Sequence, residues 1–339
     1  MISDKALSVE EASELLNVNL VTTYRYIRSG VLQAEKSGRS YSVRLADLIL
    51  YINQKNGLSP RNKGIVTSQR KAKPFLKWAG GKRQMADYLA KWTPTDIGTY
   101  HEPFLGGGAL FFHLQPEKAR LSDTNEDLIN VYKVVRDRVE DLVESLSVHK
   151  NTEEYYYEMR SVPPEKLDEV RRASRMVYLN KTCFNGLYRV NKRGEFNVPF
   201  GKKTGEFTVD AENLRLASVA LANAEIHIQD YKDALKGVRG KDFVFLDPPY
   251  YPLGGFSDFQ RYTKECFHEN DHDELFDQFQ KLAHRGVRVM QSNSNADYIR
   301  KKYIEFPIEV IKTRRLISSK ASTRSGEDIV IFSPSLYAK

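Results

Sequence analysis

The stretch FVFLDPPYYP, residues 243–252, constrains the fold of this 339-residue chain more than any other part of it. It begins with four apolar residues, the pattern of a fully buried strand. Pro248 and Pro249 must end that strand, because proline has no backbone N–H for a sheet ladder and its φ is fixed. Asp247 is therefore predicted at the carboxyl end of a buried strand, in a set direction beside Tyr250.

From Lys73 onward, short apolar runs alternate with amphipathic helical segments, which predicts an α/β sheet. Ligands of such sheets bind beyond the carboxyl ends of the strands. In LDPPYYP, the Asp247 carboxylate and the Pro248 carbonyl can accept hydrogen bonds from an NH₂ group. The ring of Tyr250 can stack on a planar ligand, so the motif predicts a site for a planar amine.

Two glycine-containing stretches precede this motif. In FLKWAGGKRQ (75–84), paired glycines let the backbone approach a ligand, and a helix N-terminus follows that can face a carboxylate or phosphate. An ordinary turn is the alternative. In TYHEPFLGGGALFFHL (99–114), a strand, the glycines 106–108 and a helix follow one another, as in nucleotide sites. Neither the dinucleotide fingerprint nor a P-loop is present.

Two further strands are predicted to end in an acid. ARLSDTNEDL (119–128) ends a strand at Asp123, which can accept hydrogen bonds from ribose hydroxyls or cap the next helix. NAEIHIQDYKDAL (223–235) ends a strand near Asp230 and Tyr231, which can border an adenine ring. These acids join Asp247 at the carboxyl edge of the sheet.

Residues 1–54 carry their own start and stop signals. Ser8 to Glu11 is a capping box, Leu20 to Arg28 reads as a second helix, and a hairpin turning at Ser37-Gly38 leads to a third helix. This arrangement resembles the winged helix-turn-helix domains of the excisionase and MerR type. Arg25 and Arg28 of the second helix would then contact DNA. A small helical packing module is the alternative. Residues 55–72 are basic and read as a linker.

Composition narrows the functional classes. The formal net charge of +8 is compatible with a polyanionic partner. Two distant cysteines and scattered histidines predict no disulfide and no metal site. No apolar run approaches the roughly 20 residues of a membrane span. A cytoplasmic protein is expected.

The chain resembles the Dam family of DNA adenine-N6 methyltransferases in six stretches that occur in order between Pro74 and Phe332: KWAGGK, EPFLGGG, SDTN, NKTCFNGLYRVNKRGEFNVPFGK, DPPY and RRLISSKASTR. The resemblance implies a Rossmann-like sheet that binds S-adenosylmethionine. It also implies a mainly helical target-recognition insertion at about 130–215 within residues 73–339. The expected activity is methyl transfer to adenine N6 in duplex DNA, in GATC, by base flipping and direct in-line attack without a covalent intermediate.

The resemblance also implies roles for individual residues. The residues expected to carry out catalysis are Asp247, Pro248, Pro249 and Tyr250. The cofactor would be bound by Trp78, Lys82, Glu102, Phe104, Gly106, Gly107, Gly108, Asp123, Asp230 and Asp247. DNA would be bound by Lys77, Lys181, Phe184, Asn185, Leu187, Arg189, Asn191, Pro199 and Arg324, with Phe184 inserted into the duplex.

Two positions depart from the family pattern. Lys181 stands where an arginine is common, and Lys203 replaces a frequent aromatic residue. These departures concern sequence choice and leave the cofactor chemistry untouched. Alternatives are a regulator that only binds DNA, and a methyltransferase acting on cytosine N4, RNA or glutamine. Asp at the first position of DPPY favours adenine in DNA by the resemblance. A restriction-modification role with a separate cognate nuclease stays open.

Overall fold

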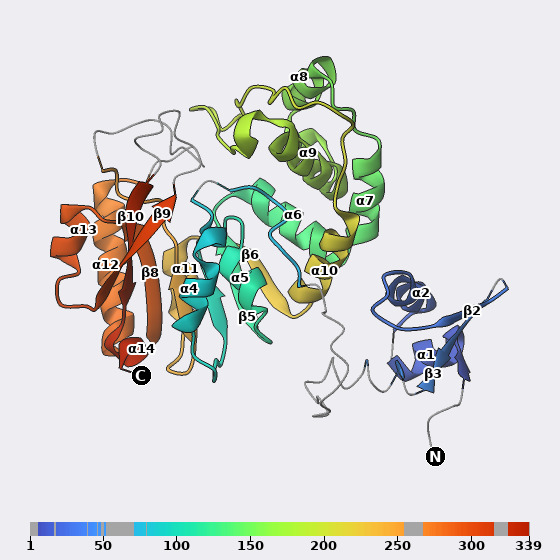
Figure 1. Cartoon of the computed structure of the whole chain (residues 1–339), viewed down its shortest axis with the longest axis horizontal. Helices are drawn as coiled ribbons and strands as arrows, with labels where there is room; N and C mark the ends of the chain where they lie inside the picture. Colours follow the sequence, from blue (N-terminus) through green and yellow to red (C-terminus); the bar gives the residue numbers. More distant parts are fainter. Residues whose placement is uncertain are drawn as a thin grey trace. The chain divides into compact units, whose positions relative to one another are not determined.

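The computed structural model describes residues 6–16, 18–38, 40–45, 47–48, 51, 71–78, 80–253, 267–314 and 325–338. The chain divides into two compact units, Met1–Arg70 and Lys71–Lys339. The predicted linker 55–72 lies outside the described residues except for its last two positions. Half of the predicted third helix, LADLILYI (45–52), also lies outside them. Each unit is described by itself (Figure 1).

The first unit contains helices α1 (Val9–Leu16) and α2 (Leu20–Arg28) and a three-stranded antiparallel sheet in the order β1-β3-β2. The predicted capping box is present, because Ser8 Oγ accepts from the N–H of Glu11 and Glu11 Oε2 accepts from the N–H of Ser8. The predicted hairpin is present as well. The strands of this sheet are β1 (Ala6–Ser8), β2 (Glu35–Ser37) and β3 (Ser40–Arg44).

The second unit is built on a seven-stranded sheet in the order β6-β5-β4-β7-β8-β10-β9. The first five strands run parallel, and β10 is antiparallel to both of its neighbours. This sheet confirms the predicted α/β class. Its strands are β4 (Tyr100–Glu102), β5 (Ala119–Asp123), β6 (Ala224–Ile228), β7 (Phe243–Leu246), β8 (Arg288–Ser294), β9 (Ile308–Arg314) and β10 (Ser325–Phe332).

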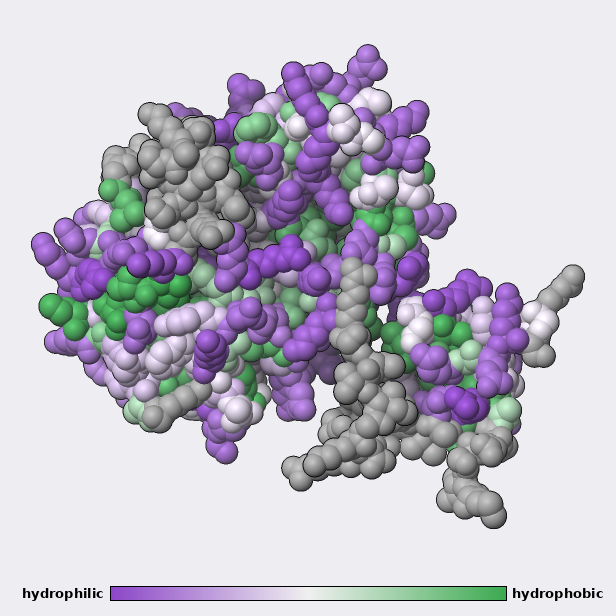
Figure 2. Space-filling model, viewed as in Figure 1, coloured by the Kyte–Doolittle hydropathy of each residue, from purple (hydrophilic) through white to green (hydrophobic). Residues whose placement is uncertain are grey.

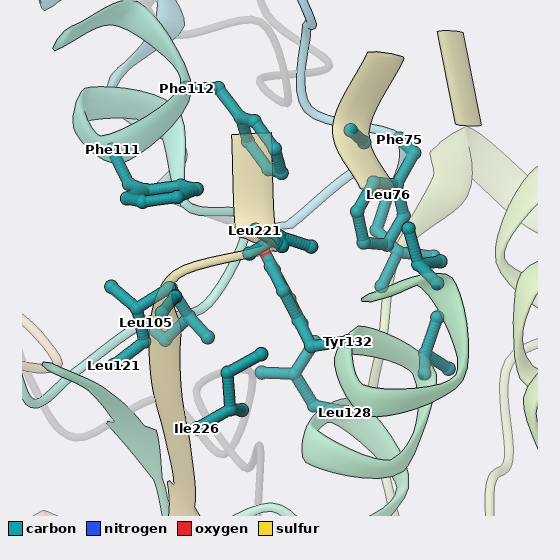
Figure 3. Packing of buried hydrophobic residues seen from close by; sticks show 14 of the residues in the cluster. Phe75, Leu76, Leu105, Phe111, Phe112, Leu121, Leu128, Tyr132, Leu221 and Ile226 are labelled. Carbon is teal, nitrogen blue, oxygen red and sulfur yellow. The ribbon is translucent and has the colours of Figure 1, made fainter. Parts of the chain in front are cut away.

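Both faces of the sheet are covered where β7 runs, so all four of its residues are buried. Phe243 and Phe245 belong to one apolar cluster, and Val244 and Leu246 belong to the other. Figure 3 shows part of the first cluster, where side chains from α5 and α6 lie together. The helices that contribute to this cluster include α4 (Ala86–Lys91), α5 (Ala109–Leu114), α6 (Glu126–Asp137) and α10 (Ala211–Leu221). The second face carries α11 (Tyr231–Ala234), α12 (Glu269–His284) and α13 (Asp297–Lys302).

A helical region is inserted between β5 and β6 (Figure 1). Its helix α9 packs on α6, α7 and α8, so the insertion is continuous with the sheet domain. Its elements after α6 are α7 (Val139–Ser147), α8 (Glu153–Ser161), α9 (Glu169–Thr182) and the short 3-10 helices η2 (Pro164–Lys166) and η3 (Phe184–Gly186). The remaining elements of the unit are η1 (Lys82–Gln84), η4 (Leu235–Gly237) and α14 (Pro334–Tyr337).

The arginines of α9 behave differently from one another. The sequence predicts a solvated helix face carrying some of them, and Arg171 fits that prediction. Arg175 is only 5% exposed, and its guanidinium donates to the carbonyls of Met159 and Arg160. Arg175 therefore fastens α9 to α8 and is unavailable to a ligand. The face shown in Figure 2 is mainly hydrophilic and carries some apolar patches.

Candidate active site

The carboxyl ends of β5, β4 and β7 lie side by side, because these strands are neighbours in the sheet and run parallel. Glu102 is the last residue of β4, Asp123 is the last residue of β5, and Asp247 follows β7 directly. The topology thus brings three of the predicted acids to one edge of the sheet, the edge where α/β folds bind ligands.

Asp247 is held from two sides through the same oxygen. Lys82 Nζ lies 2.6 Å from Asp247 Oδ1, and Ser292 Oγ donates to that oxygen at 2.6 Å. Among the described residues, Oδ2 receives no hydrogen bond. The side chain of Asp247 keeps 19% of its exposure. One carboxylate oxygen is thus fixed by the protein, and the other is left for a donor from outside.

Lys82 is buried, with 4% exposure. Its ammonium also donates to the carbonyl of Gly80 and lies 4.5 Å from the ring centre of Tyr250. Burial acts to lower the pKa of Lys82, but the charge of Asp247 and the neighbouring Tyr250 hold that pKa above its ordinary value. Lys82 is therefore a cation that positions Asp247 and Tyr250 together.

The residues after Asp247 are braced by strand β8. Pro248 is buried. The N–H of Tyr251 donates to Asn293 Oδ1 at 3.0 Å, and Ser294 Oγ donates to the carbonyl of Tyr251 at 2.6 Å. The hydroxyl of Tyr250 is buried near Ser292 and Lys82. The contacts with β8 fix the position of this loop beside Asp247.

The glycine loop after β4 packs against Trp78. Gly106 has φ of +46°, and a Cβ there would come within 2.7 Å of Trp78 Cδ1. The N–H of Gly106 donates to Asp123 Oδ2, and the N–H of Asn125 donates to Asp123 Oδ1, each at 3.0 Å. Burial raises the pKa of Asp123, and these two N–H groups oppose the shift. Helix α6 is capped by Asn125, so capping is not the role of Asp123.

Gly107 and Gly108 are also closely packed against neighbouring side chains. Gly108 has φ of +60°, and a Cβ there would lie 2.8 Å from the hydroxyl of Tyr132. That hydroxyl donates to the carbonyl of Gly106 at 3.1 Å. A Cβ on Gly107 would lie 3.3 Å from Trp78. The close packing of this loop explains why glycine occupies these positions.

Glu102 is a buried carboxyl group with 2% exposure. Its Oε2 accepts from the hydroxyl of Tyr100 at 2.8 Å. Burial raises the pKa of Glu102 to about 8, although the hydrogen bond from Tyr100 opposes the shift. Glu102 is therefore mainly protonated near pH 7, and a cationic group of a ligand beside it would favour its ionised form.

Phe104 and Asp230 border the same edge of the sheet. The ring of Phe104 stacks on Tyr231 with 5.1 Å between the centroids. Asp230 is the N-cap of α11, and its side chain accepts from the N–H of Lys232 at 2.8 Å. The aromatic pair fits one face of a planar ring, whereas Asp230 has a demonstrated structural role as a cap.

Phe184 and Asn185 stand out in the predicted DNA-binding set. Phe184 is 52% exposed, which is unusual for a phenylalanine, and its N–H donates to the carbonyl of Pro199 at 2.9 Å. Asn185 has φ of +56° in the same short helix η3. This turn presents the phenylalanine ring outward from the inserted region.

Lys77 lies beside the same turn, because a Cβ on Gly186 would meet its side chain at 2.4 Å. Asn180 fastens the contact: it accepts from the N–H of Lys77 at 2.9 Å and donates to the carbonyl of Lys77 at 2.8 Å. Lys203 donates to the carbonyl of Lys181. The two lysines that depart from the family pattern thus lie together.

The side chains of the loop 187–197 differ in their freedom. Arg189 Nε donates to Asn197 Oδ1 at 2.9 Å, which fixes the direction of the guanidinium. Leu187 packs against the apolar cluster of the inserted region. Asn191 Oδ1 accepts from the N–H groups of Arg193 and Glu195, so this side chain shapes the turn itself.

Three arginines of the predicted DNA-binding set remain. In the first unit, Arg28 is exposed near the end of α2, and Arg25 is half-buried over the ring of Tyr26. Arg324 lies outside the described residues.

Sequence reasoning missed Ser292, Asn293, Asn180 and Tyr188. Ser292 and Asn293 lie in VRVMQSNS, where a polar run follows an apolar one. That pattern marked the other strand ends, so it could have indicated β8. Asn180 sits in a helix, and its role depends on a partner 103 residues away. Tyr188 lies between two predicted DNA-binding residues and gave no signal of its own.

Cavities, metal ligands and membrane spans can also be assessed for the described residues. Two cavities of about 390 and 560 Å³ lie around His101 and Arg120, and neither is lined by a predicted catalytic or cofactor residue. The described residues contain no group of three or more side chains suited to a metal ion. None of the helices in the described part of the chain has the length and apolarity to cross a membrane.

Comparisons with known proteins address the family. Residues 78–317 match the family described as D12 class N6 adenine-specific DNA methyltransferase, and residues 6–56 match a helix-turn-helix domain family. The chain is 42% identical over 260 residues to the type II methyltransferase M1.LlaDCHI of Lactococcus lactis subsp. cremoris, covering 74% of this chain and 92% of the relative. It is 40% identical over 274 residues to the type II methyltransferase M.MjaIII of Methanocaldococcus jannaschii, with coverage of 74% and 95%.

A third relative is the DNA adenine methylase of Escherichia coli strain K12, which is 34% identical over 263 residues. The match covers 76% of this chain and 94% of that enzyme. The predicted resemblance to the Dam family and to helix-turn-helix domains is thereby confirmed. The chain belongs to the D12 class of N6 adenine-specific DNA methyltransferases and carries a helix-turn-helix domain in front of the enzyme.

Proposed function

We propose that this enzyme methylates N6 of an adenine that has been flipped out of duplex DNA, with Asp247 and the Pro248 carbonyl accepting the hydrogens of the amino group. One observation carries the proposal. Lys82 and Ser292 both engage Asp247 Oδ1, and Oδ2 receives no hydrogen bond among the described residues. The carboxylate is therefore oriented and still able to accept from a substrate amine.

S-adenosylmethionine is the proposed methyl donor, and when bound it supplies a methyl group activated by a sulfonium. The residues of the site fit its chemistry. Glu102 offers a buried carboxyl to a cation. Asp123, at the end of the adjacent strand β5, is held by the N–H of Gly106. Binding is proposed for the full set of Trp78, Lys82, Glu102, Phe104, Gly106, Gly107, Gly108, Asp123, Asp230 and Asp247.

The amino group of adenine is a poor nucleophile, because its lone pair is delocalised into the ring. Hydrogen bonds to Asp247 and the Pro248 carbonyl favour a pyramidal nitrogen, and they strengthen as positive charge develops on it. Lys82 and Ser292 hold the acceptor in one direction beforehand. Positioning of the nitrogen in line with the donor supplies much of the remaining rate enhancement.

A base inside a duplex is out of reach of Asp247, so the target must leave the stack. Unstacking costs a few kcal/mol, which aromatic contacts offset in part. The ring of Tyr250 is proposed to stack on the flipped adenine. Phe184, which is 52% exposed, is proposed to enter the duplex.

The proposed recognition sequence is GATC or a close variant. Lys77, Leu187, Arg189 and Pro199 are proposed to contact bases, supported by their gathering around η3. Lys181, Asn185 and Asn191 are proposed to contact DNA nearby. The names of the type II relatives favour a restriction-modification role beside a separate nuclease.

The helix-turn-helix domain is proposed to bind DNA as well, through Arg25 and Arg28 of α2. Residues 1–54 would form this domain, 55–72 the linker and 73–339 the methyltransferase. Sequencing of methylated adenines in DNA from a host without its own adenine methylase would give the recognition site. Comparing the full chain with a form lacking residues 1–72 would show whether the front domain restricts methylation to particular loci.

The test of the chemistry is tritium transfer from S-adenosylmethionine to duplex DNA. Asp247→Ala is expected to abolish transfer while the protein remains folded. Asp242→Asn is a matched control, because Asp242 is a buried acid at the other end of β7. Its carboxylate accepts a hydrogen bond from the N–H of Thr99. That variant should lose stability and keep its turnover per folded molecule. Near-normal transfer by Asp247→Ala would refute the assignment.

A further inference from the structure

Tyr188 lies between Leu187 and Arg189, two residues proposed to contact bases, yet its own side chain points away from them. It is 7% exposed and belongs to the apolar cluster of the sheet domain, as does Val190. Leu187 instead packs against the cluster of the inserted region. The segment is extended, so successive side chains alternate between two sides. One side is anchored in the enzyme body, and the other carries the recognition residues.

The anchor is specific as well as apolar. The ring of Tyr188 stacks on Trp78, with 4.9 Å between the centroids and 21° between the planes. Burial raises the pKa of Tyr188 to about 12, and the side chain of Asn125, which lies near its hydroxyl, opposes the shift. Trp78 belongs to the KWAGGK stretch and Asn125 to the SDTN stretch. One tyrosine of the recognition segment thus contacts two motifs of the cofactor site.

These contacts link the residues that surround the glycine loop. Trp78 lies against Gly106, the N–H of Gly106 donates to Asp123, and the N–H of Asn125 donates to the same carboxylate. Tyr188 joins the two ends, since it touches both Trp78 and Asn125. A shift of Tyr188 would move the support of Asp123 and of Gly106 at the same time.

We propose that Tyr188 is a positioning residue that fixes the recognition segment to the glycine loop, and thereby sets both cofactor affinity and sequence discrimination. The proposal rests on the proposed base contacts of Leu187 and Arg189. Because Arg189 follows Tyr188 directly, the direction of its guanidinium depends on where Tyr188 is held. Trp78, in turn, keeps its place against the loop because Tyr188 covers its ring.

Three variants of the full-length enzyme test this role. Tyr188→Leu removes both the stack on Trp78 and the hydroxyl near Asn125, and Tyr188→Phe removes only the hydroxyl. Tyr156→Phe is the matched control, because the buried hydroxyl of Tyr156 donates to the carbonyl of Val198 at 2.7 Å within the inserted region. Tyr156 belongs to the separate cluster that contains Leu187, so the control weakens the same region without touching the cofactor motifs.

The first measurement is the dissociation constant of S-adenosylhomocysteine without DNA, by titration calorimetry. Tyr188→Leu is expected to weaken binding about tenfold, Tyr188→Phe about threefold, and Tyr156→Phe not at all, consistent with the loss of a stacking or hydrogen-bonding contact. The second measurement is the ratio of kcat/KM for the preferred duplex to that for a duplex with one changed base. That ratio should fall in the same order.

The outcomes separate the proposals. If both Tyr188 variants lose only thermal stability, as Tyr156→Phe does, then Tyr188 merely fills space and the inference is overturned. If Tyr188→Leu does not fold, Tyr188→Phe still decides, because its ring keeps the packing. A wild-type enzyme that does not discriminate between duplexes would contradict the proposed base contacts. The measurement of S-adenosylhomocysteine binding would still test whether Tyr188 supports the cofactor loop.

Discussion

Lys82 and Asp247 form an ion pair of 2.6 Å in which the lysine is almost completely enclosed. Removing one partner of such a pair leaves the other charge uncompensated, and this costs more than the pair itself contributes. The pair therefore couples the stability of the fold to the geometry of the catalytic loop.

We expect Lys82→Met to lower the free energy of unfolding by about 2–3 kcal/mol, less than for a fully buried pair because Asp247 keeps some exposure. The double variant Lys82→Met/Asp247→Asn should recover more than half of that loss. Urea unfolding of the two single variants and the double variant measures the coupling. Losses that add to within about 0.5 kcal/mol would show that the two groups do not interact.

Gly106→Ala tests the close packing of the glycine loop. The new Cβ would require a left-handed backbone and would overlap Trp78, so a loss of about 2–4 kcal/mol is expected. Binding of S-adenosylhomocysteine should weaken at least about tenfold, since the loop must move. Gly286→Ala is the matched control, because Gly286 has φ of +73° and nothing within 4 Å of a Cβ. A loss equal to that of the control, about 1 kcal/mol, would mean that Trp78 adapts freely.

Arg189→Ala tests base recognition. Asn197 aims the guanidinium, and a bidentate contact with one base contributes about 1–3 kcal/mol of discrimination. We expect kcat/KM on the best site to fall less than the ratio between that site and a single-base variant. Arg193→Ala, in the exposed turn of the same loop, should leave the ratio unchanged. An equal loss on all duplexes, with a shallower salt dependence, would mark Arg189 as a phosphate contact.

The lowered pKa of His149 predicts how the stability of the fold depends on pH. Its ring stacks on Tyr178, and its two nitrogens meet the hydroxyls of Tyr155 and Ser174. Burial lowers the pKa of His149 to about 4, whereas the unfolded chain takes up this proton near pH 6.5. The contribution is therefore complete above pH 6.5 and is lost as the pH falls toward 4.

The expected loss from His149 is about 1–2 kcal/mol after allowance for its partial exposure. His149→Gln cannot take up a proton, so its urea midpoint should change less between pH 7 and pH 4.5. Burial also lowers the pKa of His272 to about 4, so part of the dependence of the urea midpoint on pH should remain in this variant. A slope equal to that of the wild type would show that folding does not lower the pKa of His149.

The sequence determined the local parts of the site. Two prolines after FVFL end a strand wherever it lies, so Asp247 had to follow the carboxyl end of β7. The glycines 106–108, between an apolar strand and an apolar helix, predicted a backbone loop that a ligand can approach. The capping box at Ser8 and the hairpin after Glu35 could also be predicted from the sequence. These features depend on residues within a few positions of one another.

Only the tertiary structure decided which side chains meet. Ser292 reaches Asp247 across 45 residues, and Asn180 reaches Lys77 across 103. Arg175 turns inward, and Tyr188 faces the cofactor motifs although both neighbours belong to the recognition set. The physical reason is that periodicity and turn chemistry fix the conformation and the buried side of a segment. The partner on that buried side follows from the order of strands and the packing of helices, which no short stretch of sequence contains.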